Sequence, residues 1–430
     1  MKKLLPLLLL TVLPSAAQAQ YTYVTNNSTI TITKYTGSDS VVIIPASISG
    51  LPVTSVGNSA FKGYSSLTSV TIPDTITNIG ASAFESCVGL NAVTLGTNLI
   101  TIGSQAFVGC SKLAGITLPD SVTSIGTDAF AYCPVLTSAT IPDSVTALGS
   151  FAFEFDTGLI TAKIGKSVSI LQWGLFGGCR SLTNVILPEG LNSIQDVAFN
   201  GCTSLSNVII PGGVTYIGNH AFEGCSLTHV IIPNTVTVVL SYAFQNCTNL
   251  TSVTISTGLT RLMGSTFQRC ANLKSVTIPG NVQSVWDTDF GGCTNLLAMY
   301  FQGNAPTLNL DPVAPGWGVM VMSNNPSLIV YYLPGTSGWG PTFGGRPTAL
   351  WRLPYPLILD QSPSFGVRSN QFGFVISWAT NAPVVVEAAA DLANPVWSAL
   401  KTNTLINGSC YFSDPAWRNY PARFYRTRSP

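Results

Sequence analysis

The chain has little charge and almost no histidine, and these absences exclude several classes of function. Asp, Glu, Lys and Arg make up 9% of the 430 residues, and the formal net charge is +1. A nucleic-acid-binding protein needs a basic surface to meet the phosphates, so we expect no nucleic-acid partner. The two histidines, His220 and His229, are too few for a metal site built from several histidines. Because G-x-S-x-G motifs and glycine-rich phosphate loops are also missing, we expect no catalytic residue and no cofactor.

Long apolar runs are missing after the first 20 residues, so we expect no membrane span there. The chain opens with MKKLLPLLLLTVLPSAAQAQ, in which two lysines precede an apolar stretch, Leu4–Leu13, and small residues follow. This order is typical of a secretory signal peptide, and the stretch is too short for a membrane helix and contains Pro6. We therefore predict a signal peptide at residues 1–19, cleaved after Ala19, and a secreted or cell-surface protein.

The dominant pattern is a repeat of 23 residues. A phenylalanine recurs at this interval, and the interval is one residue shorter before Phe244 because a residue is deleted between Cys225 and Leu227. Eleven units in this register predict stacked coils rather than separate globular domains. The repeated residues are Phe61, Phe84, Phe107, Phe130, Phe153, Phe176, Phe199, Phe222, Phe244, Phe267 and Phe290.

The segment LAGITLPDSVTSIGTDAFAYC, residues 113–133, is a representative unit. It begins with the spacing L-x-x-L-x-L, which is typical of a leucine-rich repeat in which alternate residues of a short strand point inward. One coil cannot bury this face alone, so we expect each strand to pair in parallel with the strand of the next coil, about 4.8 Å away. A glycine four residues before the Phe marks a corner, and a proline ends the strand. The expected inward residues are Leu113, Ile116, Leu118, Val122, Ile125, Ala129, Phe130 and Cys133.

The units IPDSVTSIGTDAF and VTIPDTITNIGASAFESC resemble the BspA-type leucine-rich repeats of bacterial surface proteins. The resemblance covers about Val53 to Gln302 and implies a leucine-rich-repeat solenoid. Members of that family are taken to be surface or secreted proteins that bind host or matrix proteins or other cells, and the family has no catalytic residues to carry over. Later repeats depart from the pattern at the corner glycine, where they have Gln172, Gln195, Leu240, Met263 and Trp286.

These patterns together predict a mainly β protein with four parts after the signal peptide. Residues 20–56 are expected to form an N-terminal cap and a degenerate first coil, and residues 57–302 the solenoid of eleven coils. Residues 303–364 are expected to form a C-terminal cap and linker, and residues 365–430 a small β-sandwich. The last part contains five strand-like segments, FGFVISW, APVVVEAAA, WSALKTNTL, GSCYFSDPAW and ARFYRTRSP. Its end, YPARFYRTRSP, resembles a C-terminal module attached to many secreted bacterial proteins.

Two further expectations concern the ends of the coil stack, which need caps because the last coils would otherwise expose apolar residues. At the N-terminal end, the alternating run Thr29–Thr33 and the apolar run Val41–Ile44 predict a hairpin around Gly37-Ser38-Asp39. At the other end, the apolar strand Leu328–Leu333 is expected to cover the final coil strand, Leu296–Gln302.

Nine of the ten cysteines occupy one repeat position, three residues after the Phe. A string of metal sites or disulfides is one interpretation, but parallel positions aim neighbouring Cβ atoms the same way, and nine cysteines cannot pair completely. Tyr64 and Asp156 replace the cysteine in two repeats, which a metal chain would not tolerate. We therefore expect a column of buried thiols and no metal, with Cys410 as a separate free buried thiol. The column contains Cys87, Cys110, Cys133, Cys179, Cys202, Cys225, Cys247, Cys270 and Cys293.

The candidate binding residues lie on the exposed side of the repeat strand. Thr occupies the outward position between the last two inward residues in many repeats, but three consecutive repeats have Ile there. Contiguous exposed apolar surface often marks an interaction site, although Ile also suits a β-strand slightly better than Thr. The predicted strip and its polar border are Ile186, Ile209, Ile231, Asn184, Asn207, His229 and the neighbouring Lys163.

We therefore predict a secreted or cell-surface protein that binds an extracellular protein or glycan through a repeat face, without catalysis. One alternative is a passive structural solenoid that presents the C-terminal module. Another is a carbohydrate-active enzyme, which would need two carboxylates facing each other, such as Asp120 and Asp143 in adjacent coils. Repetition of an acidic residue at this turn favours a solvated structural role instead.

Overall fold

A computed structural model of the protein describes residues 20–310, 325–353, 355–360, 364–368, 370–378 and 383–429. The predicted signal peptide, residues 1–19, lies outside the described residues. The chain divides into two compact units, residues 1–188 and 189–430. Apart from one 3-10 helix, η2 (Trp417–Asn419), the regular elements of the described residues are β-strands, which confirms a mainly β protein.

In the first unit, the repeat strands expected from the L-x-x-L-x-L spacing form parallel ladders in which the register advances by one repeat. Thr161 lies opposite Asn184, for example, and Lys163 lies opposite Ile186. The central residue of each strand points inward, and we call the residues before and after it the outer strand face. These strands are β3 (Val41–Ile43), β6 (Ser69–Thr71), β8 (Ala92–Thr94), β11 (Ser138–Thr140), β13 (Thr161–Lys163) and β15 (Asn184–Ile186).

The coil of residues 113–133 departs from this pattern. Residues 115–117 form no strand, and Ile116 and Leu118 are half-buried rather than fully buried. The other inward residues predicted for this coil are buried, with exposed fractions of 0–1%. The prediction of the inward face is therefore confirmed for six of its eight residues.

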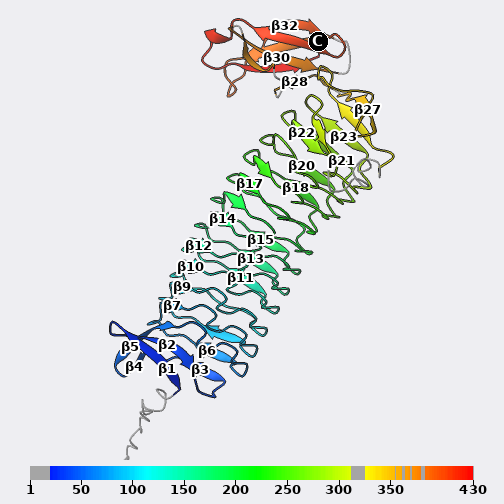
Figure 1. Cartoon of the computed structure of the whole chain (residues 1–430). Helices are drawn as coiled ribbons and strands as arrows, with labels where there is room; N and C mark the ends of the chain where they lie inside the picture. The colour runs from blue at the N-terminus through cyan, green and yellow to red at the C-terminus, as the bar shows by residue number, and fades with distance from the viewer. Residues whose placement is uncertain are drawn as a thin grey trace, which may run out of the picture. The chain divides into compact units, whose positions relative to one another are not determined.

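A second, shorter strand in the coils of the first unit was not predicted. It ends directly before the corner position and pairs in parallel with its counterparts, so that β10 lies between β9 and β12 (Figure 1). The corner glycine is needed because neighbouring coils approach closely there: a Cβ on Gly126 would lie 2.3 Å from the backbone nitrogen of Ser104. In the first unit these strands are β7 (Asn78–Ile79), β9 (Thr101–Ile102), β10 (Ser124–Ile125), β12 (Ala147–Leu148) and β14 (Ile170–Leu171).

The N-terminal hairpin differs from the predicted one. Strand β2 (Thr29–Tyr35) pairs antiparallel with β1 (Tyr21–Asn26), whereas β3 pairs in parallel with β6. The prediction was wrong because it overlooked the two-residue turn Asn27-Ser28, where both residues have positive φ, as tight hairpin turns require. On its other edge β2 pairs in parallel with β5 (Leu51–Val56), which also pairs with the short strand β4 (Ser47–Ile48).

The repeated phenylalanines form a column of stacked rings in the core of each unit. In the first unit, the ring centroids of Phe84 and Phe107 are 5.1 Å apart, and those of Phe107 and Phe130 are 5.4 Å apart. In the second unit, the Phe199–Phe222 and Phe222–Phe244 separations are both 5.2 Å. The one-residue deletion before Phe244 therefore leaves the column unchanged, because the deletion is absorbed in a turn.

The second unit has the same two kinds of ladder. Its repeat strands are β18 (His229–Ile231), β20 (Ser252–Thr254), β21 (Ser275–Ile278) and β23 (Ala298–Phe301). Strand β25 (Ile329–Tyr332), which lies within the predicted strand Leu328–Leu333, pairs in parallel with β23. Beyond it the sheet continues with β27 (Arg346–Leu350) and β26 (Thr342–Phe343). The shorter strands are β16 (Ser193–Ile194), β17 (Tyr216–Ile217), β19 (Val238–Val239), β22 (Ser284–Trp286) and β24 (Thr307–Asn309).

The last strands of the second unit form two antiparallel sheets around one apolar core. All five strand-like segments that the sequence suggested are present, and two more strands, β28 and β29, precede them. Phe374, Ile376 and Phe412 from one sheet pack with Val384 and Val386 from the other. The first sheet contains β28 (Leu357–Leu359), β29 (Gly366–Arg368), β30 (Gln371–Ser377) and β33 (Ser409–Asp414), and the second contains β31 (Pro383–Ala389), β32 (Ser398–Thr404) and β34 (Phe424–Arg428).

Candidate interaction surface

Three of the seven predicted binding residues lie on the outer strand face of the first unit. In β15, Val185 is 9% exposed, whereas Asn184 and Ile186 on either side of it face solvent. Ile186 is 52% exposed, and Lys163 of β13 lies opposite it in register. The alternation of a strand therefore places the Ile side chain outward, as the sequence predicted.

The other four predicted residues belong to the second unit. Ile209 and Ile231 are 78% and 64% exposed, whereas the neighbouring Val208 and Val230 are buried. His229 and Ile231 belong to β18, but Asn207–Ile209 form no regular strand, which the sequence did not predict. The two coils are still joined by a hydrogen bond from the backbone nitrogen of Thr228 to the carbonyl of Ser206, at 3.1 Å. Exposure of all three Ile side chains is thus confirmed, and a continuous strip from Ile186 to Ile231 stays a prediction.

Further exposed apolar residues, which the sequence-based prediction did not include, lie on the outer strand face. Val41 and Ile43 of β3 are 61% and 73% exposed and pair with Ser69 and Thr71 of β6. The same signal could have revealed them, because Val41 and Ile43 alternate with the buried Val42 and Ile44. The outer strand face of the first unit therefore carries exposed apolar side chains at its first coil as well as at β15.

Aromatic rings occupy this repeat position near the end of the second unit. Tyr300 of β23 stacks on Tyr331 of β25 with a centroid distance of 5.1 Å, and its centroid is 4.8 Å from that of Trp351. All three side chains are half-buried. Only Tyr300 could be assigned to the repeat from its position, because the other two residues follow the last regular unit.

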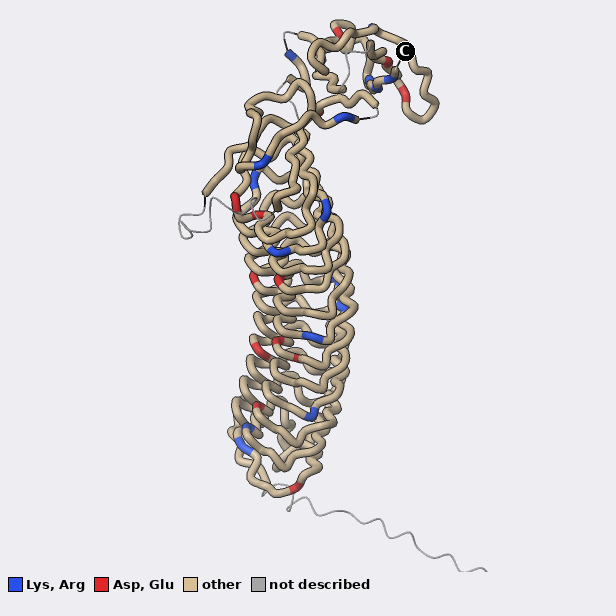
Figure 2. Tube along the Cα trace, turned by 90° about the vertical axis from the view of Figure 1, so that its right-hand side faces the viewer, with Lys and Arg blue, Asp and Glu red and all other residues tan. Residues whose placement is uncertain are grey.

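Charges are sparse on both units. Figure 2 shows Lys, Arg, Asp and Glu scattered among uncharged residues. Asp143 accepts a hydrogen bond from the backbone nitrogen of Lys166 in the next coil at 3.0 Å, and this bond together with the Lys166 ammonium lowers its pKa. Asp74 likewise accepts from the backbone nitrogen of Thr97 at 2.7 Å. The acidic residue after the strand proline therefore joins consecutive turns, which supports a structural role.

Thiols of the cysteine column are buried and bonded to the backbone of the preceding coil. The Sγ of Cys87 donates to the carbonyl of Phe61 at 3.1 Å, and the Sγ of Cys293 donates to that of Phe267 at 3.1 Å. Burial raises the pKa of Cys87 and of Cys247 to about 12. Cys410 is half-buried rather than buried, so that part of the prediction was wrong. A buried, protonated thiol is a poor nucleophile, so the column packs as small apolar side chains.

We expect these nine thiols to stay reduced even under oxidising conditions. Alkylation before and after denaturation, followed by mass spectrometry, should modify the column only after unfolding, whereas the half-buried Cys410 should react earlier. Disulfide-linked tryptic peptides from adjacent repeats would contradict this prediction.

Asp156 replaces the column cysteine in the coil of Phe153 and is completely buried. Its Oδ1 accepts a hydrogen bond from the backbone nitrogen of Cys133 at 2.7 Å, whereas its buried Oδ2 has no hydrogen-bond partner. Burial raises the pKa of Asp156 well above its ordinary value, and the Cys133 bond opposes this only in part. The carboxyl group is enclosed in the core, where no substrate can reach it.

No constellation for metal chemistry is found in the part of the chain that the structure describes. No group of three or more His, Cys, Asp and Glu side chains there is placed to hold a metal ion. Among the same residues, no helix has the length and apolar character needed to cross a membrane.

Comparison with known proteins identifies the repeat. The family model of the BspA type leucine-rich repeat region matches residues 54–182 and 169–297, which together span more than half of the chain. The chain belongs to this family. The BspA-type repeat accounts for the coil positions described above, from the strand through the corner to the Phe and Cys columns. No curated protein matches the chain.

Solved structures of bacterial leucine-rich-repeat proteins are similar to this BspA-type chain. A leucine-rich repeat protein from Bacteroides ovatus is 27% identical with a TM-score of 0.54, and the match covers 67% of this chain and 88% of that one. A leucine rich cell surface protein from Faecalibacterium prausnitzii is 27% identical with a TM-score of 0.45, covering 75% and 94%. The leucine-rich repeat protein of Treponema pallidum is 35% identical with a TM-score of 0.41, covering 44% and 88%. The Bacteroides ovatus structure supports the solenoid fold.

Proposed function

We propose that this protein is a secreted or cell-surface binding protein that recognises an extracellular protein or glycan through its outer strand face, without catalysis. The observation that carries the proposal is the exposure of Ile186, Ile209 and Ile231 on a repeat position where other coils have Thr. An outward Ile side chain exposes apolar surface to water, which is unfavourable in free energy. A partner that covers this side chain removes the apolar surface from water and gains that free energy. The N-terminal sequence and the family support an extracellular location.

An apolar centre with a polar border fits a protein partner better than a glycan, whose surface is covered with hydroxyl groups. Asn184, Asn207 and His229 flank the Ile positions and supply hydrogen-bonding groups, as the rim of a protein interface does. Lys163 is the one charged residue of the predicted set, so the affinity should change little with salt concentration.

The test is the triple variant Ile186→Thr, Ile209→Thr, Ile231→Thr, which restores the residue found in neighbouring coils. We expect an unchanged melting temperature and weaker binding to partners found by screening the protein against extracellular proteins and glycans. The matched control, Val88→Thr, Val135→Thr, Ile160→Thr, alters three exposed apolar residues outside the outer strand face and should bind normally. Unchanged affinity of the first variant would show that the face is only scaffold and that the protein acts as a structural solenoid.

A further inference from the structure

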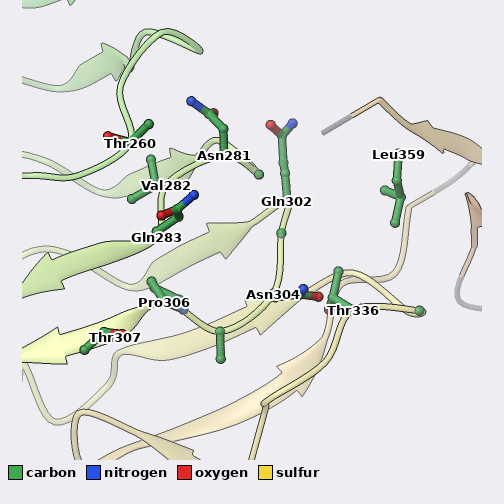
Figure 3. Close-up of a pocket in the computed structure, with 14 residues that line it drawn as sticks. Thr260, Asn281, Val282, Gln283, Gln302, Asn304, Pro306, Thr307, Thr336 and Leu359 are labelled. Atoms are coloured by element: carbon green, nitrogen blue, oxygen red, sulfur yellow. The ribbon is translucent and has the colours of Figure 1, made fainter. Parts of the chain in front are cut away.

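A polar pocket lies within the second unit, between the last coils and strand β28 of the first antiparallel sheet. Its volume is about 410 Å³, which falls within the range of small-ligand sites, roughly 300–1,000 Å³. Four parts of the chain form it: Thr260, the turn before β22, the chain from β23 to the start of β24, and the turn at Gly335-Thr336. Leu359 of β28 also lines the pocket. In the view of Figure 3, Gln302 lies between Asn281 and Leu359.

The lining side chains are uncharged and rich in hydrogen-bonding groups. No Asp, Glu, Lys, Arg or His and no aromatic ring belongs to the lining. A charged ligand would therefore lose its hydration without meeting a counter-charge. The side chains that carry amide or hydroxyl groups into the lining include Thr260, Asn281, Gln283, Gln302, Asn304 and Thr307.

Several of these groups are not used by the fold. Asn281 donates from Nδ2 to the carbonyls of Thr257 and Leu259, but its buried Oδ1 has no hydrogen-bond partner. Within the residues that the structure describes, the side-chain amides of Gln283 and Gln302 make no hydrogen bond. The Oδ1 of Asn281 is closed off from the pocket, whereas the amides of Gln283 and Gln302 can hydrogen-bond a ligand.

Apolar surface accompanies these polar groups. Val282 and Leu359 are 4% and 5% exposed and lie among the lining residues, together with Pro306. A sugar ring has hydroxyl groups that donate and accept at its edge and C–H groups on its faces. A primary amide also donates and accepts at one position, so amides beside apolar side chains match this chemistry.

We infer that this pocket binds an uncharged saccharide. Gln283 and Gln302 hydrogen-bond its hydroxyl groups, and Val282 and Leu359 contact the ring. Because none of these residues belongs to the outer strand face, the inference does not depend on the function proposed above. It also gives the C-terminal sheets a role, since Leu359 of β28 closes one side of the site.

The test uses isothermal titration of the full protein with neutral oligosaccharides of glucose, galactose, mannose, xylose and N-acetylglucosamine. We expect at least one of them to bind, and the double variant Gln283→Thr, Gln302→Ala to bind it about tenfold more weakly or worse, because both side-chain amides are lost. Thr is the residue of the two preceding coils at the position of Gln283, so the fold should tolerate it. If the double variant has a lower melting temperature than the wild type, the single variant Gln283→Thr serves as the test.

Asn192→Thr is the matched control, because it removes an exposed amide at the same repeat position but outside the pocket. This variant should bind as the wild type does. The inference is overturned if no neutral saccharide binds or if the double variant binds with unchanged affinity. It is also overturned if Asn192→Thr weakens saccharide binding as much as the double variant does. Binding of an uncharged peptide in place of every saccharide, with the same loss in the double variant, would overturn the ligand class. The triple Ile variant should bind the saccharide normally, which separates this result from the test of the outer strand face.

Discussion

Replacing Phe130 by alanine is expected to lower the free energy of unfolding by about 3–5 kcal/mol. The ring is completely buried, and it stacks between Phe107 and Phe153 with centroid distances of 5.4 and 5.3 Å. Loss of the ring leaves a cavity bounded by a coil on each side. Those coils are held by backbone hydrogen bonds, such as the bond from Phe130 to the carbonyl of Ala152, so they cannot easily collapse into the cavity.

Thr117→Ala in the same coil is the control for this prediction. Thr117 is exposed on the outer side of the coil, so its loss removes little packing and should cost less than about 1 kcal/mol. Urea denaturation followed by circular dichroism measures both values. Equal losses of stability in the two variants would mean that the inward and outward positions are assigned wrongly.

Replacing Asp156 by cysteine, the residue of the neighbouring column positions, is expected to stabilise the protein by about 1–3 kcal/mol at pH 8. The gain has two sources. Asp156 has a buried Oδ2 without a partner, and the carboxyl group must either stay protonated or carry a charge in the core. A thiol at this position avoids both costs and donates to the preceding coil, as Cys133 does to Phe107.

The sign of the pH dependence follows from the raised pKa of Asp156. A carboxyl group with a higher pKa in the folded protein than in the unfolded chain binds its proton more tightly when folded. Its contribution to stability is fully present below the unfolded pKa and is lost as the pH rises through the folded pKa. The advantage of Asp156→Cys over the wild type should therefore grow from pH 4 toward pH 8.

Denaturation of both proteins across this pH range measures the difference. Asp143→Asn is a matched control, because Asp143 is exposed and its pKa is lowered by Lys166, so removing that carboxylate should not stabilise the protein at pH 8. A constant difference between wild type and Asp156→Cys from pH 4 to pH 8 would show that Asp156 does not titrate in the core.

Repetition explains what the sequence could predict. The Phe and Cys columns could be predicted from spacing alone, because the same inward positions recur along the repeat and the stacking of coils places the equivalent side chains next to one another. The second, shorter strands of the coils could not be found this way. Ser124-Ile125 is too short to show alternation, and it becomes a strand only because Thr101-Ile102 and Ala147-Leu148 lie beside it.

The binding residues were predictable only where they repeat. Ile186, Ile209 and Ile231 stand out against the Thr of other coils, and their exposure follows from the alternation of the strand. The polar pocket carries no such signal. Its residues come from segments as far apart as Thr260 and Leu359, and Leu359 lies outside the regular units, so only the folded chain brings them together.

The unchanged ring spacing across the shortened turn has a consequence for how such a chain can evolve. Phe222 and Phe244 stack as closely as Phe199 and Phe222 although one residue is missing between them. A coil therefore depends on the positions of its neighbours and not on the exact number of residues that separate it from them. Unequal recombination between gene segments of about one repeat could then insert or remove whole coils, or leave a turn one residue short, and the products would still fold. Variation in coil number between related genes is thus an expected outcome of this architecture.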